Sequence, residues 1–336
     1  MPFIYTRDLV KEFRRLRPRT GRLAGVRKLF SRDFEAVRAV DGVDVSIEAG
    51  ELVGYLGPNG AGKSTTIKML TGILTPTSGE VTVAGVVPWR RRQHNARNIG
   101  VVFGQRSQLW WDLPLIDSFR LIGKLYRVPP KRYAENLERF SRLLDMESFL
   151  DTPVRQLSLG QRMRGDLAAA MIYEPDILYL DEPTVGLDVI AKERIREFVA
   201  ELNRDRGTTI ILTTHDMDDV EHLCRRLVLI DHGRVLYDGS TAGLKEKYHP
   251  RRELSVQLAS AAEGRESGAS GLAGVADAEV VHAEDGHVRL SFDPAEISAA
   301  ALIARICADH DVTDLSVTEP DLEDVIKRMY ADREGP

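Results

Sequence analysis

A glycine-rich segment that ends in a lysine and two hydroxyl residues carries the clearest chemistry in this sequence. It matches the pattern G-x-x-x-x-G-K-[ST] and consists of Gly57, Pro58, Asn59, Gly60, Ala61, Gly62, Lys63, Ser64 and Thr65. Glycines let backbone N–H groups surround phosphates, Lys63 offers a positive charge to the β- and γ-phosphates of a nucleotide, and Ser64 offers a hydroxyl to Mg²⁺. A glycine-rich turn that binds no nucleotide is the alternative interpretation.

Two carboxylates follow a second apolar run. The run 177–180 predicts a buried strand, and Asp181 and Glu182 come directly after it. Ligands of open α/β sheets bind at the carboxyl ends of the strands, and carboxylates at such an end need partners. We expect Asp181 to hold Mg²⁺ through water and Glu182 to act as the general base for an attacking water. Capping of a following helix is the alternative role.

A serine and a glutamine form the pattern of a capping box. Ser158 precedes Gln161 by three residues and opens an apolar helix that carries Leu159, Met163 and Leu167. A helix N-terminus also presents unpaired N–H groups and the positive end of the helix dipole, which suits a phosphate. Helix capping and phosphate binding are therefore compatible roles for this segment.

The elements that must position these residues alternate between strands and helices. Apolar or alternating runs predict strands at 2–6, 39–47, 52–56, 177–180 and 208–212. Helical spacing predicts helices at 66–70 and within 116–150. Such alternation predicts a mostly parallel sheet. Beyond an Ala-, Gly-, Ser- and Glu-rich linker at 259–274, a strand and helix pattern predicts a small α+β domain, so that the chain divides into domains at 1–247 and 248–336.

Several short motifs follow one another in a fixed order between residues 57 and 216. After the glycine-rich segment come Gln105, the pentapeptide 157–161, Asp181 with Glu182, the tripeptide 186–188, and His215. This order resembles the ATP-binding cassette (ABC) family, and with its flanks the similarity spans roughly residues 2–247. The resemblance implies an α/β P-loop NTPase cassette with a mixed sheet core and a helical subdomain at about 106–165. It also implies ATP hydrolysis, with ATP and Mg²⁺ as cofactors.

The resemblance implies catalytic roles for two single residues. Gln105 stands at the Q-loop position, where it would ligate Mg²⁺ and sense the attacking water, and His215 stands at the switch position, where the imidazole would meet the γ-phosphate. Taken alone, a glutamine is explained equally by a solvent-facing position. A single histidine at a strand end is more often structural than catalytic.

The same resemblance implies that the site is completed by a second chain. Family members form a head-to-tail homodimer around two ATP molecules. The ATP held by one chain then contacts Ser158, Gly160 and Gln161 of the other chain's signature, and Asp188 belongs to the D-loop that crosses the interface. A two-fold pair of this kind closes on itself and forms no filament. The third signature residue, Leu159, departs from the glycine most common in the family, and we expect activity to survive this change.

The aromatic residue that stacks on adenine is the least defined part of the site. Phe13 is our choice, and Phe34 remains the alternative. A basic insert at 14–32, with eight Lys or Arg and no acid, separates Phe13 from the next strand. It is either a solvated loop or a short amphipathic helix at the membrane or at a membrane subunit, and similar inserts occur in polysaccharide exporters of the family.

Residues 106–130 are expected to contact integral membrane permease subunits. Trp110 and Trp111 are adjacent, so the two rings point different ways in any regular structure, and core packing does not explain both. Interfaces are enriched in aromatic residues, which favours a partner-binding patch.

Bulk properties restrict the class of protein. The 336 residues carry a net charge of −5, which excludes nucleic acid as a partner on electrostatic grounds. We expect no signal peptide and no membrane span, hence a peripheral protein at the cytoplasmic face of the membrane, with Cys224 and Cys307 as buried free thiols.

The sequence thus predicts the ATPase subunit of an ABC exporter with separate membrane subunits. The tail at 315–325 resembles export-type cassettes linked to drug resistance. An importer subunit is the nearest alternative. A soluble, non-transporting ABC ATPase is less favoured, because the chain has one cassette and no heptad block.

Overall fold

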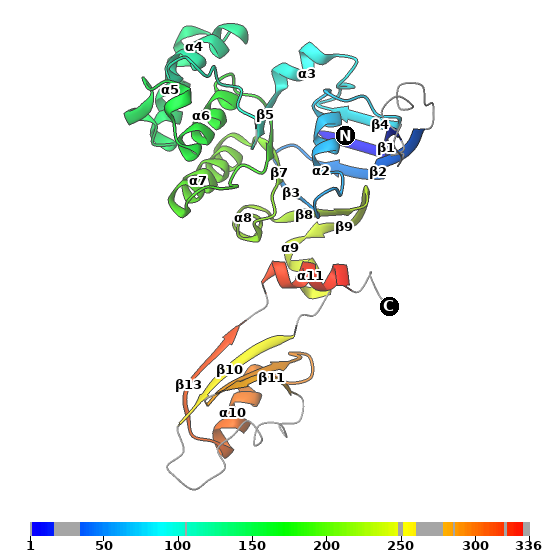
Figure 1. Ribbon diagram of the computed structural model, residues 1–336, viewed down its shortest axis with the longest axis vertical. Helices are drawn as coiled ribbons and strands as arrows, with labels where there is room; N and C mark the ends of the chain where they lie inside the picture. Colours follow the sequence, from blue (N-terminus) through cyan, green and yellow to red (C-terminus); the bar gives the residue numbers. More distant parts are fainter. Residues whose placement is uncertain are drawn as a thin grey trace, which may run out of the picture. The chain divides into compact units, whose positions relative to one another are not determined.

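The structure is a computed structural model that describes residues 2–16, 34–104, 106–247, 251–259, 278–284, 286–318 and 321–331. It divides into two compact units, an N-terminal unit, Met1–Ser240, and a C-terminal unit, Thr241–Pro336 (Figure 1). The short helix α9 (Thr241–Lys247) belongs to the C-terminal unit because it packs against α11 (Leu322–Ala331). The domain boundary expected after residue 247 lies at the other end of this helix.

A six-stranded sheet forms the centre of the N-terminal unit. Its order is β5 (Ile99–Phe103), β6 (Ile177–Asp181), β7 (Thr209–Thr213), β3 (Leu52–Leu56), β8 (Arg226–Asp231) and β9 (Arg234–Ser240). All neighbours pair in parallel except β8 and β9, which are antiparallel. β6 and β7 are buried almost throughout, as expected for strands covered on both faces. The predicted mixed sheet core is confirmed.

A second sheet is antiparallel and has the order β2 (Phe34–Ile47), β1 (Ile4–Leu16) and β4 (Ser78–Val83). β1 and β2 are much longer than the predicted strands, and their ladder runs from the pair Ile4–Ile47 to the pair Leu16–Phe34. Arg14, Arg15 and Leu16 are therefore strand residues, whereas residues 17–32 of the basic insert lie outside the described residues. One apolar core, which includes Ile4, Val43, Val53 and Tyr179, joins both sheets.

Some helices of the N-terminal unit flank the sheets, and others form a separate group at one side of the unit. They are α2 (Lys63–Leu70), α3 (Arg92–Asn98), α4 (Leu115–Leu125), α5 (Pro130–Leu143), α6 (Leu159–Met171), α7 (Val189–Arg206) and α8 (Met217–Leu223), with short 3₁₀ turns at Glu147–Phe149 and Val154–Gln156. Figure 1 shows α4, α5 and α6 grouped away from β1, β2 and β4. The helical region expected at 116–150 is broken between α4 and α5, where Arg127 has a positive φ and Pro129 caps α5.

The C-terminal unit is an α+β structure. Its antiparallel sheet has the order β11 (Ala278–Glu284), β12 (His287–Phe292), β10 (Arg252–Leu258) and β13 (Val312–Thr318). Leu302 and Ile306 of α10 (Ala299–Asp309) pack with Leu254, Val256 and Leu290 in its core. Cys224 of the N-terminal unit is buried as expected, but Cys307 is exposed, because it lies on the face of α10 turned away from that core.

Candidate active site

The P-loop is held by close backbone packing at two of its glycines. A Cβ on Gly57 would lie 2.2 Å from the carbonyl oxygen of Ile230, and one on Gly62 would lie 2.4 Å from that of Ala39. Gly62 also has a φ of 107°, in the left-handed region, where it caps α2. Glycine is therefore required at both positions for steric reasons, before any phosphate is considered.

Lys63 begins α2 and turns its amine back into the loop. Its Nζ donates hydrogen bonds to the carbonyl oxygens of Gly57 (2.6 Å) and Pro58 (3.2 Å). Burial lowers the pKa of Lys63, while Glu182 and Asp181 act in the opposite direction. The amine is thus a partly desolvated positive charge beside two backbone carbonyl groups of the loop, where a bound phosphate would meet it.

Ser64, Asp181 and Thr213 form a set of oxygen atoms at the carboxyl ends of β6 and β7. The Ser64 hydroxyl donates to Oδ2 of Asp181 at 3.0 Å, and the Thr213 hydroxyl donates to Oδ1 at 2.5 Å. Asp181 and Thr213 face each other in the parallel ladder. A hydroxyl beside one carboxylate fits Mg²⁺, which is usually held by one or two protein oxygens together with substrate phosphates. Among the described residues, no group of three or more His, Cys, Asp and Glu forms a separate metal site.

Glu182 and His215 face each other at the same end of the sheet. Nδ1 of His215 lies 3.5 Å from Oε1 of Glu182. Glu182 has a φ of 56°, which is uncommon for a residue other than glycine, and its N–H donates to the carbonyl oxygen of Thr213 at 2.8 Å. Strained backbone of this kind clusters at functional sites. The pair offers a carboxylate base and an imidazole donor to one reacting group.

Ser64, Asp181 and Glu182 border one cleft of about 430 Å³, a volume within the usual range for small-molecule sites. Asn59, Ser64, Glu182, Gly104 and Arg106 are among the residues that line it. A Cβ on Gly104 would lie 2.5 Å from the carbonyl oxygen of Glu182, so this side of the cleft also requires a glycine. The predicted Gln105 lies outside the described residues, although both of its neighbours line the cleft.

The capping box at the start of α6 is present as expected. The N–H of Gln161 donates to Oγ of Ser158 (3.2 Å), and the N–H of Ser158 donates to Oε1 of Gln161 (2.9 Å). Met163 and Leu167 are buried, but Leu159 is 40% exposed and so does not lie on the apolar face predicted for it. A Cβ on Gly160 would lie 3.2 Å from Cβ of Ala191, so the start of α6 lies against the start of α7.

Three further predicted residues lie away from these contacts or cannot be placed. The Asp188 side chain caps α7 by accepting from the N–H of Ala191 (2.8 Å), and its role toward ATP stays a prediction. Phe13 lies on β1, 40% exposed, with the Lys11 amine 5.4 Å from the ring centre. Phe34 begins β2, and its side chain lies outside the described residues. The choice between the two aromatic residues stays open.

Sequence reasoning missed two side chains that support the site, Thr213 and Asp219. Thr213 holds Asp181 directly, and Asp219 binds Thr184, which follows Glu182 by two residues. A hydroxyl that ends a buried strand beside a histidine was the available signal for Thr213. Asp219 left no comparable signal, because its partners are far apart in the sequence.

The chain is similar in sequence to known ATP-binding proteins. The model of the family described as ABC transporter matches residues 40–185. The ABC transporter ATP-binding protein NatA of Bacillus subtilis is 34% identical over 212 residues, which cover 63% of this chain and 86% of that protein. The chain belongs to the ABC transporter ATP-binding family. It is an ATP hydrolase and the ATP-binding subunit of a transporter.

Other ABC proteins agree with this assignment. The Nod factor export ATP-binding protein I of Cupriavidus metallidurans is 39% identical over 218 residues, covering 65% of this chain and 70% of that protein. The solved dimeric structure of the ATP-binding cassette MJ0796, in a post-hydrolysis state with ADP and Pi, shares the fold. It has a TM-score of 0.59 and 24% identity, and covers 70% of this chain and 98% of that one.

ABC ATP-binding subunits dimerise and work with membrane permease subunits. Within the described part of this ABC subunit, every helix is too short or too polar to span a bilayer. The family match and the solved structures that share the fold confirm the predicted fold, family and ATPase activity.

Proposed function

We propose that two copies of this chain close around two Mg²⁺–ATP molecules and thereby drive export through separate permease subunits at the cytoplasmic face of the membrane. The observation that carries the proposal is that Ser64, Asp181 and Glu182 line one cleft. Lys63 directly precedes Ser64 with its amine turned back into the loop, and His215 lies beside Glu182. Lys63 and the loop N–H groups bind phosphate, Ser64 and Asp181 hold Mg²⁺, and Glu182 takes a proton from water. Mg²⁺ neutralises charge on the phosphates when it is bound.

The signature supports the dimeric part of the proposal. Ser158 and Gln161 leave the N-terminus of α6 capped, exposed and free of acidic residues in its first turn. An exposed helix N-terminus is suited to a γ-phosphate supplied by a second chain. Gln105 and Asp188 are proposed as the Mg²⁺-sensing and interface residues of the same site.

The proposals of export and of permease binding rest on a relative and on an exposed aromatic pair. One relative is named for Nod factor export. Trp110 and Trp111 are 42% and 52% exposed, and the Arg162 guanidinium lies 5.3 Å from the Trp111 ring centre. An exposed aromatic pair of this kind fits the centre of an interface. We assign this pair, within residues 106–130, to the permease, with residues 14–32 as a second contact.

The decisive experiment uses Glu182→Gln, which keeps the side-chain size and removes the base. The variant should bind ATP and Mg²⁺, hydrolyse ATP at least about a hundredfold more slowly, and remain dimeric with ATP in light scattering. Glu138→Gln, an exposed residue of α5, should behave as the wild type. A variant that binds ATP but stays monomeric, also when assembled with its permease, would refute the dimeric mechanism.

Direction of transport needs a separate measurement. Co-purification should identify the membrane subunits, and deletion of the chain should raise the cellular level of the transported compound. A fall in uptake, with efflux unchanged, would identify an importer instead.

A further inference from the structure

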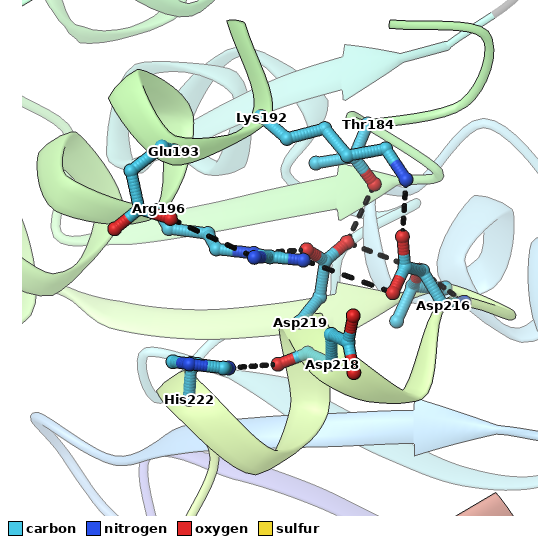
Figure 2. A network of polar contacts seen from close by, with 9 residues as sticks. Thr184, Lys192, Glu193, Arg196, Asp216, Asp218, Asp219 and His222 are labelled. Atoms are coloured by element: carbon cyan, nitrogen blue, oxygen red, sulfur yellow. Dashed lines mark hydrogen bonds and ion pairs between the residues drawn. The ribbon is translucent and has the colours of Figure 1, made fainter. Parts of the chain in front are cut away.

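The carboxylate of Asp219 is buried behind the reacting groups and touches none of them. It lies on α8, is 1% exposed, and accepts hydrogen bonds at both oxygens. Nε of Arg196 lies 2.6 Å from Oδ1, and the hydroxyl of Thr184 lies 2.5 Å from Oδ2 (Figure 2). The Thr214 hydroxyl is a more distant neighbour of Oδ2, at 3.4 Å. A buried charge held this closely is costly to disturb.

The partners of Asp219 come from three segments that the proposed reaction depends on. Thr184 follows the base Glu182 by two residues, and Thr214 directly precedes His215. Arg196 lies on α7, the helix that begins after Asp188. One carboxylate therefore joins the segment of the base, the segment of the imidazole and the helix that leads from the D-loop.

Asp216, which directly follows His215, makes further contacts with α7. Its Oδ2 accepts from the Lys192 amine at 2.5 Å, and its Oδ1 lies 3.7 Å from Nη2 of Arg196. Its N–H donates to the Thr214 hydroxyl at 3.0 Å. His215 thus stands between Thr214, which contacts Asp219 of α8, and Asp216, which pairs with Lys192 of α7. The side chain of His215 itself is 65% exposed. The backbone of His215 is fixed and its side chain is left accessible.

We propose that Asp219 is a positioning residue for ATP hydrolysis, which keeps Glu182 and His215 aligned and ties both to α7. The inference rests on the ATPase activity and concerns its geometry. A base and an imidazole must hold their relative placement to within about 1 Å, since a shift of that size far from the chemistry costs up to about a hundredfold in rate. Asp219 and its partners do not border the cleft, so ATP binding should not depend on them.

Thr184→Val tests the inference with a near-isosteric change. The variant loses only the hydroxyl that donates to Asp219, and we expect kcat for ATP to fall about tenfold with KM within about twofold of the wild type. Thr184→Ser restores the hydroxyl and should restore most of kcat. All assays use the full chain, with thermal unfolding measured for each variant.

A matched control separates positioning from general destabilisation. Thr209 is fully buried at the opposite end of β7, where its hydroxyl accepts from the N–H of Gly50 at 2.9 Å. Thr209→Val should lower Tm by a similar amount and leave kcat unchanged. Equal losses of kcat in Thr184→Val and Thr209→Val, or an unchanged kcat in Thr184→Val, would overturn the inference.

A second variant covers the case in which Thr184→Val fails to fold. Arg196→Lys keeps the positive charge beside Asp219 but loses the fixed planar geometry of the guanidinium. We expect the same fall in kcat at unchanged KM, and an unchanged kcat would again overturn the inference. A wild-type chain without ATPase activity would instead contradict the function itself, so the two failures are distinct.

Discussion

Cδ2 of Leu159 lies 3.2 Å from the position that a Cβ on Gly186 would occupy. The third residue of the signature therefore packs on the D-loop of its own chain. Gly186 has a φ of 73°, a left-handed conformation that favours glycine, and a Cβ there would also lie in tight contact with Leu159. Leucine at this position, where glycine is expected as the commonest family residue, fills space between two segments that the proposed dimer brings to its interface.

Leu159→Gly should loosen this contact. We expect ATPase activity to fall by about two- to fivefold with ATP affinity unchanged, because glycine also weakens the first turn of α6. Leu159→Met retains the volume and should stay near the wild type. Gly186→Ala should be more damaging than Leu159→Gly, and the opposite order in steady-state ATPase assays would contradict the packing role.

Ser158 caps α6 in the structure, and we propose that it also contacts a phosphate. Substitution of Ser158 by aspartate distinguishes these two roles. Aspartate caps helices as well as serine does, so Ser158→Asp should keep Tm, but its charge should abolish ATP-dependent dimerisation. Ser158→Ala should lower stability by about 1 kcal/mol and weaken dimerisation less. If Ser158→Asp dimerises with ATP as the wild type does, the N-terminus of α6 does not approach a phosphate.

Lys63→Ala should lower ATP affinity by at least about tenfold, because a partly desolvated charge is lost from the phosphate loop. Lys131→Ala removes an exposed lysine of α5 and serves as the control. Calorimetric titration with ATP provides the measurement. Equal affinities for Lys63→Ala and the wild type would remove the P-loop from nucleotide binding.

Asp166 should make stability depend on pH. Its carboxylate accepts from the Gln108 N–H and the Ser107 hydroxyl, and burial raises its pKa from 3.8 to about 6 in spite of these bonds. Between these two values the folded chain holds a proton that the unfolded chain releases. The contribution of Asp166 to stability is therefore lost as pH rises from about 4 to 6.

Asp166→Asn abolishes this titration and can still accept both hydrogen bonds at Oδ1. Its Tm relative to the wild type should rise between pH 4 and 7, for a free-energy change of up to about 3 kcal/mol. Asp151→Asn, at an exposed position, is the control. A Tm difference between Asp166→Asn and the wild type that is constant with pH would place the pKa of Asp166 outside this window.

Replacing both exposed tryptophans should separate permease binding from catalysis. Trp110→Ala with Trp111→Ala should abolish co-purification with the membrane subunits, while ATP binding by the isolated chain is retained. Val281→Ala, which removes a 53% exposed valine from β11, should leave co-purification intact. Normal capture of the double variant would assign the permease contact to another surface.

The sequence predicted the parts of the fold that are set by local patterns. β3, β6 and β7 are short and largely apolar runs, and their prediction was accurate to within one residue at each end. β4 was missed because its first half is exposed and polar. The length of β1 and β2 was missed because their outer halves carry Arg, Lys and Glu, which resemble a loop in sequence.

The residues of the site likewise divide into those that a local pattern predicts and those that it does not. Lys63, Ser64, Asp181 and Glu182 follow from spacing, since each stands at the junction of a strand and a loop or helix. The pair Asp181–Thr213 depends on the register between β6 and β7, and register is a property of the assembled sheet. No sequence pattern within a single segment predicts such a contact.

The pairing of Leu16 with Phe34 has a consequence for how such a subunit can diverge. The two residues face each other across an antiparallel ladder, so the chain that joins them leaves and re-enters the cassette within roughly 5 Å. The entropy cost of a closed loop grows only with the logarithm of its length. A lineage can therefore lengthen, shorten or exchange residues 17–33 while the ATPase machinery is inherited unchanged.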